Sequence, residues 1–513
     1  MAFFSIFLLL LLVLLSLFFI FNLKKKNPNQ PPSPPKLPII GNLHQLGKLP
    51  HRSLQKLSQN YGPIMLLQLG KVPTLVISSP EMAKQVLKTH DLECCSRPLT
   101  QGPRRLSYNF LDIAFSPYND YWKEMRKICV LELKKICVLE LFSSRRVKSF
   151  ASVREESAAS LIDLISQTSP NIPVNLSEKM FYLLDSIICK IVCGRSYQGK
   201  QFQNGSNSKH EKVIQEAMAM LGSFSAADFF PYVGWIVDVF TGLHDRREKS
   251  FHEFDEFYQM VIDEHLDPHR PVPENEDTVD FLIRLLKNQS DGGSLTQDHI
   301  KAILMNVFLG SIDTTSVTLV WAMTELMKNP RVMKKLQAEI RSSVGEINKP
   351  QLVEGTVCEN LKYLKMVFKE TLRLHPPSVL MIPHLAQQHI KIGGYDVYPN
   401  TRIQVNVFAI GRDPETWKNP QEFYPERFEN EAIGIDFLGQ NFELLPFGSR
   451  RRVCPGITMA TASFELVLGN LLYHFDWKLP NGMETQDLSM EEELGLTVHK
   501  KIPLCLVPIK YNP

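Results

Sequence analysis

The 513-residue sequence lacks the features that several large classes of protein require. Its formal net charge is only +3 and it has no zinc-finger spacing, so nothing supports nucleic acid as a partner. Its nine cysteines are scattered without a paired framework, which predicts reduced thiols on the cytosolic side of a membrane. It contains no Gly-x-Ser-x-Gly elbow after a strand and no His-Glu-x-x-His, which argues against a hydrolase.

An uncharged apolar run opens the chain. Residues 1–23 are nearly all Phe, Leu, Ile and Val. About 20 apolar residues span the ~30 Å hydrocarbon layer of a bilayer. Three lysines, residues 24–26, follow at once, and the positive-inside rule places that end in the cytosol. Because the run has no small-residue cleavage site, it predicts a retained, single-pass transmembrane signal anchor.

A basic and proline-rich linker, residues 24–38, follows the anchor. Proline-rich segments are extended and semi-rigid. We therefore expect the linker to hold a folded catalytic domain, residues 39–513, at a fixed attitude over the bilayer. The apolar fraction of 44% is ample for the core of such a domain.

The functional interpretation centres on residues 446–456, PFGSRRRVCPG. This stretch places Cys454 at the exit of a Gly- and Arg-rich loop, directly before a helix-like run over residues 457–472. Pro455 suits the first helical position, which would put Cys454 at the positive end of the helix dipole and favour a thiolate. Such a thiolate can bind a haem iron, with arginines for the propionates. A lone cysteine is more often a buried apolar residue, so the rest of the chain must decide.

A long apolar helix is predicted from a capping-box pair, Ser294 and Gln297, to about residue 329. Asp313 and Thr314 interrupt its middle in a GSIDTTS stretch. A buried acid is costly unless it is paired or functional, and Ser and Thr bend a helix by bonding to carbonyls one turn earlier. The bend would open a groove where an acid and an alcohol suit proton relay during oxygen chemistry. A purely structural kink is the alternative.

Two further pairs share a helical face. Trp122 and Arg126 are four residues apart on a helix predicted to start at Tyr121, and Glu370 and Arg373 are three apart on another. Taken alone, the first pair indicates ordinary packing. The second indicates a surface ion pair worth a few tenths of a kcal/mol.

A tandem repeat follows Arg126. Residues 127–134 read KICVLELK, and residues 135–142 read KICVLELF. Eight extra helical residues add ~12 Å and rotate everything downstream by ~80°. Because a packed helix cannot absorb that change, we expect an overhanging helix or a looped-out copy before Ser143. A gene-model artefact is the other explanation.

The remaining secondary structure is read from periodicity and turn residues. Residues 64–69 and 74–78 predict a hairpin, and a helix is expected from Pro80. Residues 97–115 predict a long loop, residues 153–287 are helical, and residues 391–397 and 402–407 predict short strands. Residues 493–498 predict a loop tip that enters a pocket.

In this order the motifs resemble those of the cytochrome P450 family, most closely its plant microsomal members that act on specialised metabolites. The resemblance extends from the anchor to the C-terminus. Phe447, Arg452, Cys454 and Gly456 match the family's haem-binding loop, whereas Arg450 stands where a glycine is usual. The implied fold is mainly α with a small β-rich lobe (α+β), preceded by the N-terminal transmembrane helix.

The resemblance also implies a cofactor and roles for residues. The cofactor is heme b, with Cys454 as the axial ligand of the iron, and Asp313 and Thr314 would deliver protons. The implied haem-binding residues are Trp122, Arg126, His384, Phe447, Arg452, Cys454 and Gly456. A buried triad of Glu370, Arg373 and Arg427 would brace the cysteine loop.

The implied reaction inserts one oxygen atom from O2 into a lipophilic small molecule, such as a terpenoid or an aromatic metabolite. The chain has no flavin domain and no convincing Rossmann fingerprint, so electrons must come from a separate NADPH-cytochrome P450 reductase, docking near Arg450 and Arg451. The expected location is the endoplasmic reticulum membrane, in contact with lipid, with the catalytic domain facing the cytosol. The predicted substrate pocket contains Phe110, Phe224, Leu309, Val379, Leu380 and Leu496.

Two other functions stay open at this stage. The repeat and Arg450 motivate a non-catalytic or haem-deficient membrane protein, which the carbon-monoxide Soret band of the reduced protein would identify. A reductase-independent haem-thiolate isomerase or dehydratase is the second alternative. Asp313 and Thr314 argue against it, and turnover without O2 and NADPH would support it.

Overall fold

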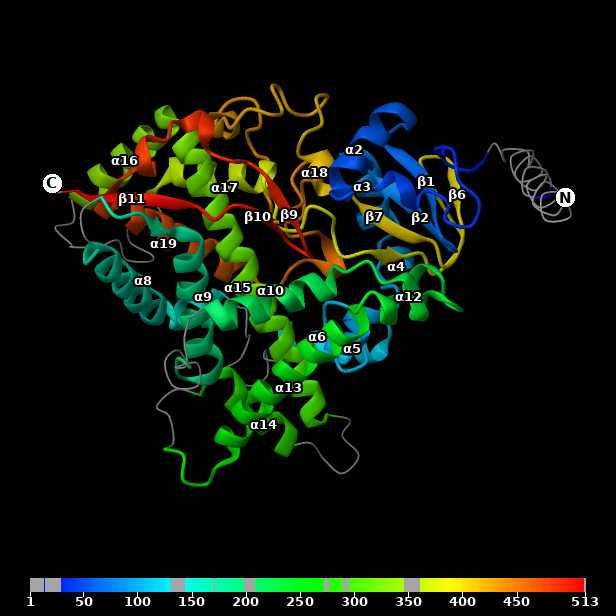
Figure 1. Cartoon of the computed structure of the whole chain (residues 1–513), viewed down its shortest axis with the longest axis horizontal. Coiled ribbons are helices and arrows are strands. Elements are labelled where there is room, and N and C mark those ends of the chain that lie inside the picture. Colours follow the sequence, from blue (N-terminus) through cyan, green and yellow to red (C-terminus); the bar gives the residue numbers. More distant parts are fainter. Residues whose placement is uncertain are drawn as a thin grey trace, which may run out of the picture.

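The structure is a computed structural model that describes residue 13 and residues 29–130, 144–168, 171–197, 208–271, 276–288, 295–345 and 360–511. Figure 1 shows a large helical body beside a smaller lobe built around a β-sheet. The predicted mainly helical fold with a small β-rich lobe is confirmed. The predicted anchor, residues 1–23, lies outside the described residues apart from Val13.

The lobe is built on a four-stranded sheet with the order β1-β2-β7-β4. The predicted hairpin is present, and its antiparallel register runs from Ile64 opposite Ile77 to Leu69 opposite Val72. Strand β2 then pairs in parallel with β7, although more than 300 residues separate them in the chain. The strands are β1 (Ile64–Leu69), β2 (Val72–Ile77), β4 (His384–Leu385) and β7 (Arg402–Val405).

Two predicted strands of the lobe differ from the structure. Residues 391–397 form a hairpin of β5 (Ile390–Ile392) and β6 (Tyr395–Val397), because Gly393 and Gly394 take positive φ angles of 58° and 83° and reverse the chain. Strand β7 ends at Val405, since the Asn406 side chain accepts the Ala409 N–H and starts a short helix instead.

Helices make up the body, as the apolar periodicity predicts. Its main helices are α6 (Asp120–Val130), α7 (Ser144–Ser149), α8 (Ala151–Ser166), α9 (Leu176–Cys193), α10 (Ser208–Leu221), α13 (Leu243–Leu266), α14 (Thr278–Lys287), α15 (Gln297–Lys328), α16 (Pro330–Gly345), α17 (Lys362–Leu374) and α19 (Ile457–His474). Shorter helices lie in and around the lobe: α2 (Pro50–Tyr61), α3 (Pro80–Lys84), α4 (Asp91–Cys94), α5 (Gln101–Leu106), α11 (Ala226–Phe229), α12 (Gly234–Phe240) and α18 (Val407–Ile410).

Helix α15 is the axis of the body. Its 32 residues rise about 48 Å at 1.5 Å per residue, enough to cross the whole domain. The helix starts at Gln297 with Thr296 as its cap, paired with His299, so the predicted Ser294–Gln297 cap is wrong. Among the described helices α15 is long and apolar enough to cross a membrane, but 78% of its most apolar stretch is buried inside the protein. It is therefore a core helix.

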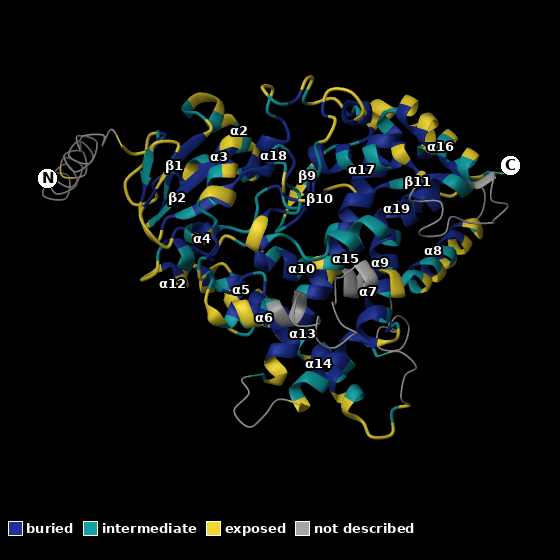
Figure 2. Cartoon of the chain, turned by 180° about the vertical axis from the view of Figure 1, so that it is seen from behind, coloured by how far each residue is buried: buried dark blue, intermediate teal, exposed yellow. Residues whose placement is uncertain are grey.

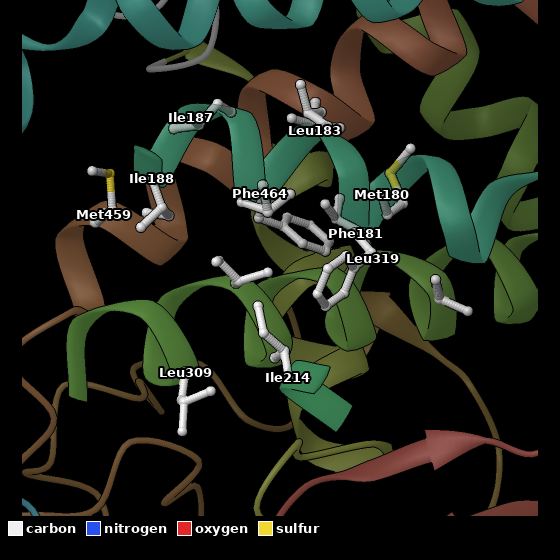
Figure 3. Close-up of a cluster of buried hydrophobic side chains, with 14 of the residues drawn as sticks. Met180, Phe181, Leu183, Ile187, Ile188, Ile214, Leu309, Leu319, Met459 and Phe464 are labelled. Atoms are coloured by element: carbon white, nitrogen blue, oxygen red, sulfur yellow. The ribbon is translucent and has the colours of Figure 1, made fainter. Parts of the chain in front are cut away.

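The main hydrophobic core lies where α9, α15 and α19 meet, and Figure 3 shows part of it. Met180, Phe181 and Ile187 of α9 pack with Leu319 of α15 and Phe464 of α19, all buried. Figure 2 shows this interior as the most continuous buried region of the molecule. The core fixes two helices that matter for the site. Helix α19 follows the cysteine loop, and α15 carries the predicted proton-relay residues.

Strands near the C-terminus complete the body. A three-stranded sheet has the order β3-β11-β8, and a separate hairpin joins β9 to β10. The turn of this hairpin is the predicted loop tip, and its Leu496 N–H donates to the Met218 carbonyl at 3.2 Å. The strands are β3 (Val174–Asn175), β8 (Phe475–Lys478), β9 (Glu492–Leu494), β10 (Val498–Lys500) and β11 (Cys505–Lys510).

The predicted long loop over residues 97–115 contains a helix, α5, which packs on α10 and α13. Gly102 allows this close packing, because a Cβ atom there would lie 2.3 Å from the Met220 carbonyl oxygen. The tandem repeat begins at the end of α6, where residues 127–130 are helical, and residues 131–142 lie outside the described residues.

Candidate active site

A mostly apolar cavity lies between α15 and the loop of residues 446–456, and the outer wall comes from α10 and the β9–β10 turn. It brings together many of the predicted site residues. Those on its lining are Arg126, Leu309, Thr314, Phe447, Arg452, Cys454, Gly456 and Leu496. The elements that meet here are far apart in sequence, so only the folded chain forms the site.

Cys454 lies on the cavity wall at the end of the loop. Its N–H donates to the Phe447 carbonyl at 2.9 Å, which closes the loop, and the Gly456 N–H points at its Sγ at 3.4 Å. Burial raises the pKa of the Cys454 thiol, while the Gly456 N–H and the Arg126 guanidinium lower it. Helix α19 starts at Ile457 with Gly456 as its cap, so Pro455 does not occupy the first helical position that the sequence predicts.

Arg450 takes a left-handed backbone conformation in the same loop, with φ at 56°. Its neighbour Gly448 also has a positive φ, of 69°. A non-glycine residue pays about 1–2 kcal/mol for this conformation because its Cβ crowds the backbone. The departure from the expected glycine therefore leaves a strained residue four positions before the cysteine.

Three arginines gather at one side of the cavity. Arg452 donates to the carbonyls of Cys95, Ile113 and Ser116 at 2.7–3.2 Å, and Arg126 donates to the Val453 carbonyl at 2.8 Å. The third, Arg97, also lines the cavity. Burial lowers the pKa of Arg97 well below its usual range, and the charges of Arg452 and Arg126 lower it further. Burial lowers the pKa of Arg452 to about 10.

Sequence reasoning missed Arg97 and chose His384. The Arg97 guanidinium donates to the carbonyls of Ile382 and Pro383 at 2.6 and 3.0 Å, directly before His384. The His384 ring is buried in the lobe, where its Nδ1 lies 2.9 Å from the Cys94 carbonyl oxygen. Burial and the nearby Arg97 lower the pKa of His384 well below its ordinary value, so its ring is neutral. Its buried Nε2 has no hydrogen-bond partner among the described residues, so the haem-binding role of His384 stays a prediction.

Trp122 is buried beside the arginines, with its ring 4.1 Å from the Arg452 guanidinium and 5.5 Å from that of Arg126. Its indole N–H donates to the Ile113 carbonyl at 2.9 Å. In this arrangement Trp122 packs against two cations rather than pointing its donor into the cavity. The predicted pairing with Arg126 on one face of α6 is present.

The hydroxyl-rich stretch of α15 makes the predicted bonds to earlier carbonyls. Thr314 Oγ1 donates to the Gly310 carbonyl at 2.6 Å, and Ser316 and Thr318 bond in the same way. Asp313 is fully buried on the other side of the helix turn, where its carboxylate accepts the Thr497 hydroxyl and lies 3.1 Å from His499 Nε2. The sequence pattern predicted a partner for this acid but did not identify it.

Glu370, Arg373 and Arg427 come together as a buried triad. Both Glu370 oxygens accept from Arg373 at 2.8 Å, and Arg427 Nε lies 3.0 and 3.2 Å from them. The two arginines donate their remaining N–H groups to backbone carbonyls of the loop that leads to α19, including those of Gly411 and Lys418. The triad thus pins the chain that carries the cysteine loop.

Four of the six predicted pocket residues lie elsewhere. Phe110 packs into the main core, because a left-handed backbone with φ at 68° turns it inward. Phe224 is half exposed and stacks on Phe229 at 4.4 Å. Val379 packs with Phe408 and Val498 in a small cluster at the edge of the lobe, and Leu380 packs against the same cluster. Leu309 and Leu496 line the cavity as predicted.

Asn306 and Asp112 were not singled out from the sequence, although they fix the cavity wall. Asn306 Oδ1 accepts the backbone N–H groups of Ile113 and Ala114, and its Nδ2 donates to Asp112. Asp112 in turn accepts from the backbone at Ala114 and Phe115. The sequence does contain a signal for Asn306: a polar amide in the middle of a strongly apolar helix indicates a buried hydrogen-bonding role.

The residues present fit a haem. One Asp112 oxygen accepts from backbone and amide donors. Two buried guanidinium groups, those of Arg97 and Arg452, and the half-buried one of Arg126 lie at one side of the cavity. Two carboxylates of a ligand would relieve their mutual repulsion. Among the described cysteines, Cys454 is the one on the cavity wall, and the remaining lining is mainly apolar, as a flat macrocycle requires. Fold and site together define a haem-thiolate protein.

The chain belongs to the cytochrome P450 family, whose model matches residues 31–506. It is 53% identical over 477 residues to cytochrome P450 71B10 of Arabidopsis thaliana, covering 92% of both chains. It is 48% identical to 2-methylbutanal oxime monooxygenase of Manihot esculenta, covering 93% of this chain and 90% of that relative. A zebrafish cytochrome P450 solved with abiraterone has a TM-score of 0.72 at 25% identity, covering 90% of this chain and all of that one.

These relations identify a cytochrome P450 monooxygenase similar to plant 71B members. The family implies a haem whose iron is bound by a cysteine thiolate, with O2, a small-molecule substrate and a redox partner. The family relations therefore favour a monooxygenase over the two alternatives, a non-catalytic membrane protein and an isomerase or dehydratase.

Proposed function

We propose that this chain is a membrane-anchored monooxygenase that inserts one oxygen atom from O2 into a lipophilic small molecule, with Cys454 as the iron ligand of its haem. The single observation that carries the proposal is the position of Cys454 on an apolar cavity wall that is also lined by three arginines, two of them buried. A bound haem would supply the activation of O2. Arg97, Arg126 and Arg452 would hold its propionates, and Phe447 and Gly456 would pack beside the thiolate.

Asp313 and Thr314 carry the proposed proton delivery. Thr314 lies on the cavity wall, and its hydroxyl donates to the Gly310 carbonyl, a bond of the kind that bends helices. Asp313 lies next to it, fully buried yet hydrogen-bonded. The triad of Glu370, Arg373 and Arg427 contributes geometry rather than chemistry, because a buried and fully paired cluster fixes the loop that carries Cys454.

The cavity lining favours a lipophilic substrate. Met218, Leu221, Ile303, Leu309 and Leu496 form the wall opposite the cysteine loop. A terpenoid or an aromatic metabolite fits this chemistry, and the relative named for 2-methylbutanal oxime adds small aliphatic oximes to the candidates. The few hydroxyls on the wall, including Ser311 and Thr315, would orient one polar group of the substrate.

Electrons would come from NADPH through a separate cytochrome P450 reductase. Arg450 and Arg451 are exposed on the face behind the cysteine loop, and Arg451 pairs with Asp91 at 3.0 Å. Exposed cations so close to the iron ligand would attract an acidic partner and shorten the path of the electron.

The proposed membrane attachment rests on two features at one end of the molecule. Helix α12 and the residues before it expose a set of large apolar side chains: Tyr232, Val233, Trp235, Val237, Val239 and Phe240. The described chain begins nearby at Asn29, whose carbonyl accepts the Asp396 N–H, and the β1–β2 turn is bonded to Phe229 just before α12. Figure 2 shows α12 at the same end of the molecule as β1 and β2 of the lobe.

We therefore retain the proposed division into an anchor (1–23), a linker (24–38) and a catalytic domain (39–513), in the endoplasmic reticulum membrane and facing the cytosol. The structure adds that residues of the linker contact the lobe, since the Leu66 N–H donates to the Pro32 carbonyl at 2.8 Å. The linker would thus hold α12 against the bilayer surface.

Microsomes that contain the protein and a reductase test this function. The reduced, carbon-monoxide-bound protein should show the Soret band of a thiolate-bound haem, and Cys454→Ser should abolish it. NADPH-dependent oxidation within a panel of terpenoids, aromatic metabolites and aliphatic oximes should then identify the substrate. A folded protein without the thiolate band, or turnover that needs neither O2 nor NADPH, would contradict the proposal.

A further inference from the structure

The C-terminal hairpin reaches into the active site beside α15. Thr497 lines the cavity at the turn between β9 and β10. Its hydroxyl donates to a carboxylate oxygen of Asp313, whose side chain has no exposed surface. The cavity wall and the buried acid are therefore joined by one hydrogen bond.

His499 continues this connection outward. Its Nε2 lies 3.1 Å from one Asp313 oxygen, 3.2 Å from the other and 3.1 Å from Thr497 Oγ1. About a quarter of its side chain, 24%, is exposed. The three side chains thus form a continuous hydrogen-bonded path from the cavity, through the buried acid, to the surface.

The backbone holds this path in place. Thr497 and His499 are two residues apart where the chain enters β10, so their side chains lie on the same face. The Trp321 indole N–H donates to the Val498 carbonyl at 3.1 Å and ties the strand to α15. Thr314, by contrast, donates its hydroxyl to Gly310 of its own helix. The link between Asp313 and the surface therefore runs through the hairpin.

We propose that His499, Asp313 and Thr497 are the proton-uptake path of the active site, with His499 as its outer, positioning residue. A proton from water binds the exposed imidazole, whose Nε2–H passes its proton to Asp313. The Thr497 hydroxyl, which donates to Asp313 at rest, turns to release its proton toward the cavity and takes the proton from Asp313. Asp313 and Thr497 end as they began, the imidazole returns from its Nδ1–H to its Nε2–H tautomer by exchange with water, and one proton has crossed. This inference rests on the proposed proton-delivery role of Asp313.

Oxygen reduction by the holoenzyme with reductase and NADPH tests the path without an organic substrate. One-electron reduction of O2 to superoxide uses no proton, whereas two-electron reduction to hydrogen peroxide takes up two. His499→Gln should therefore raise the ratio of trapped superoxide to hydrogen peroxide by roughly a hundredfold, at the low end for loss of a positioned proton donor. Thr497→Val should act in the same direction, and Thr497→Ser should behave as wild type.

His389→Gln is a matched control. His389 also pairs with a carboxylate, Asp396 at 3.1 Å, but it lies on the surface of the lobe. Glu493→Gln is a second control, because Glu493 faces His499 across the β9–β10 register and carries the neighbouring charge. Both variants should keep the wild-type ratio.

A second readout does not depend on turnover. The imidazole ¹⁵N signals of His499, assigned by their loss in His499→Gln, should shift in Asp313→Asn, because the carboxylate that holds Nε2–H becomes an amide. Unchanged signals would overturn the proposed contact. Because this measurement needs no turnover, it still tests the contact if a variant loses its haem.

The outcomes separate this inference from the proposed function. If Asp313→Asn raises the superoxide share and both His499→Gln and Thr497→Val do not, the path is wrong while the role of Asp313 stands. If Asp313→Asn also leaves the share unchanged, both fail.

Discussion

At the scale of single residues, Arg450 determines how well the cysteine loop is held. Its φ of 56° suits glycine and strains arginine. Arg450→Gly should raise the free energy of unfolding by up to about 1 kcal/mol and increase haem occupancy, because relief of about 1–2 kcal/mol of strain exceeds the roughly 0.5–1 kcal/mol that glycine costs through the unfolded chain. Thermal unfolding and the carbon-monoxide difference spectrum per mole of protein measure the two effects.

Arg451→Gly is the matched control for this substitution. Arg451 is the next residue, is also exposed, and is not among the residues with positive φ. Glycine there should lower stability by adding freedom to the unfolded chain. Equal haem occupancy in Arg450→Gly and wild type would show that the loop tolerates the arginine.

The Glu370 triad supports a second prediction. Glu370→Gln leaves two fully buried guanidinium groups without a carboxylate, which costs about 3–5 kcal/mol. We expect loss of the thiolate Soret band together with a large fall in the unfolding temperature. Glu429→Gln, at an exposed acid two residues after Arg427, should leave both unchanged. A stable, haem-loaded Glu370→Gln protein would refute the bracing role.

Individual residues were predictable where a motif fixes their spacing, and less so elsewhere. Cys454 and Arg452 reach the cavity because the loop that carries them is short and closed. Phe110 was misplaced because the direction of its side chain depends on packing with distant segments. Arg97 was missed for the same reason: it belongs to no local pattern and reaches the site only through the fold.

At the scale of elements, α5 and α11 are joined by Asp228, whose carboxylate accepts the Gln101 N–H at 2.9 Å. Burial raises the pKa of Asp228 to about 6, although the hydrogen bond from Gln101 and the charge of Arg402 both lower it. The folded pKa lies above the ordinary value, so the folded state binds more protons, and the free energy of unfolding should fall as pH rises from about 4 to 6. The expected fall is about 2–3 kcal/mol.

Asp228→Asn tests this dependence. The amide oxygen still accepts the Gln101 N–H but cannot ionise, so the variant should lose this part of the pH dependence and be more stable than wild type at pH 7.5. Thermal unfolding at pH 5 and pH 7.5 measures both effects. A variant whose stability keeps the full wild-type slope would assign the pH dependence to other groups.

Helices and strands with strong apolar periodicity were predicted well. The wrong predictions of secondary structure arose at turns and in short elements. The 64–77 hairpin and the long α15 match their predictions within a few residues. Residues 391–397 failed because two consecutive glycines reverse the chain. The helix inside residues 97–115 was missed because its six residues are stabilised by packing on α10 and α13 rather than by their own pattern.

At the scale of the whole molecule, the fluorescence of Trp235 can test the proposed membrane contact. It is the exposed member of the five tryptophans, at 58%, while the other four are at most 8% exposed. In vesicles with brominated lipids, the full-length protein should show quenching of a part of its fluorescence that Trp235→Phe removes. Quenching that persists in Trp235→Phe would place the membrane contact elsewhere.

The order of motifs along the chain was enough to predict the family and the overall architecture. The path through Thr497 and His499 was not predictable, because it joins α15 to a hairpin about 185 residues later without any motif of its own. The cavity wall was not predictable either, because α10, α15 and the hairpin contribute to it from distant parts of the sequence.

The parallel pairing of β2 with β7 has a consequence for biosynthesis. Strand β2 ends at Ile77, and its neighbour β7 begins at Arg402. At about 5–20 residues per second, the ribosome needs roughly 15–65 s to make the intervening chain. During that time the apolar edge of β2 has no partner strand. A nascent chain in this state is a substrate for chaperones, and slow codons after residue 77 would lengthen its exposure.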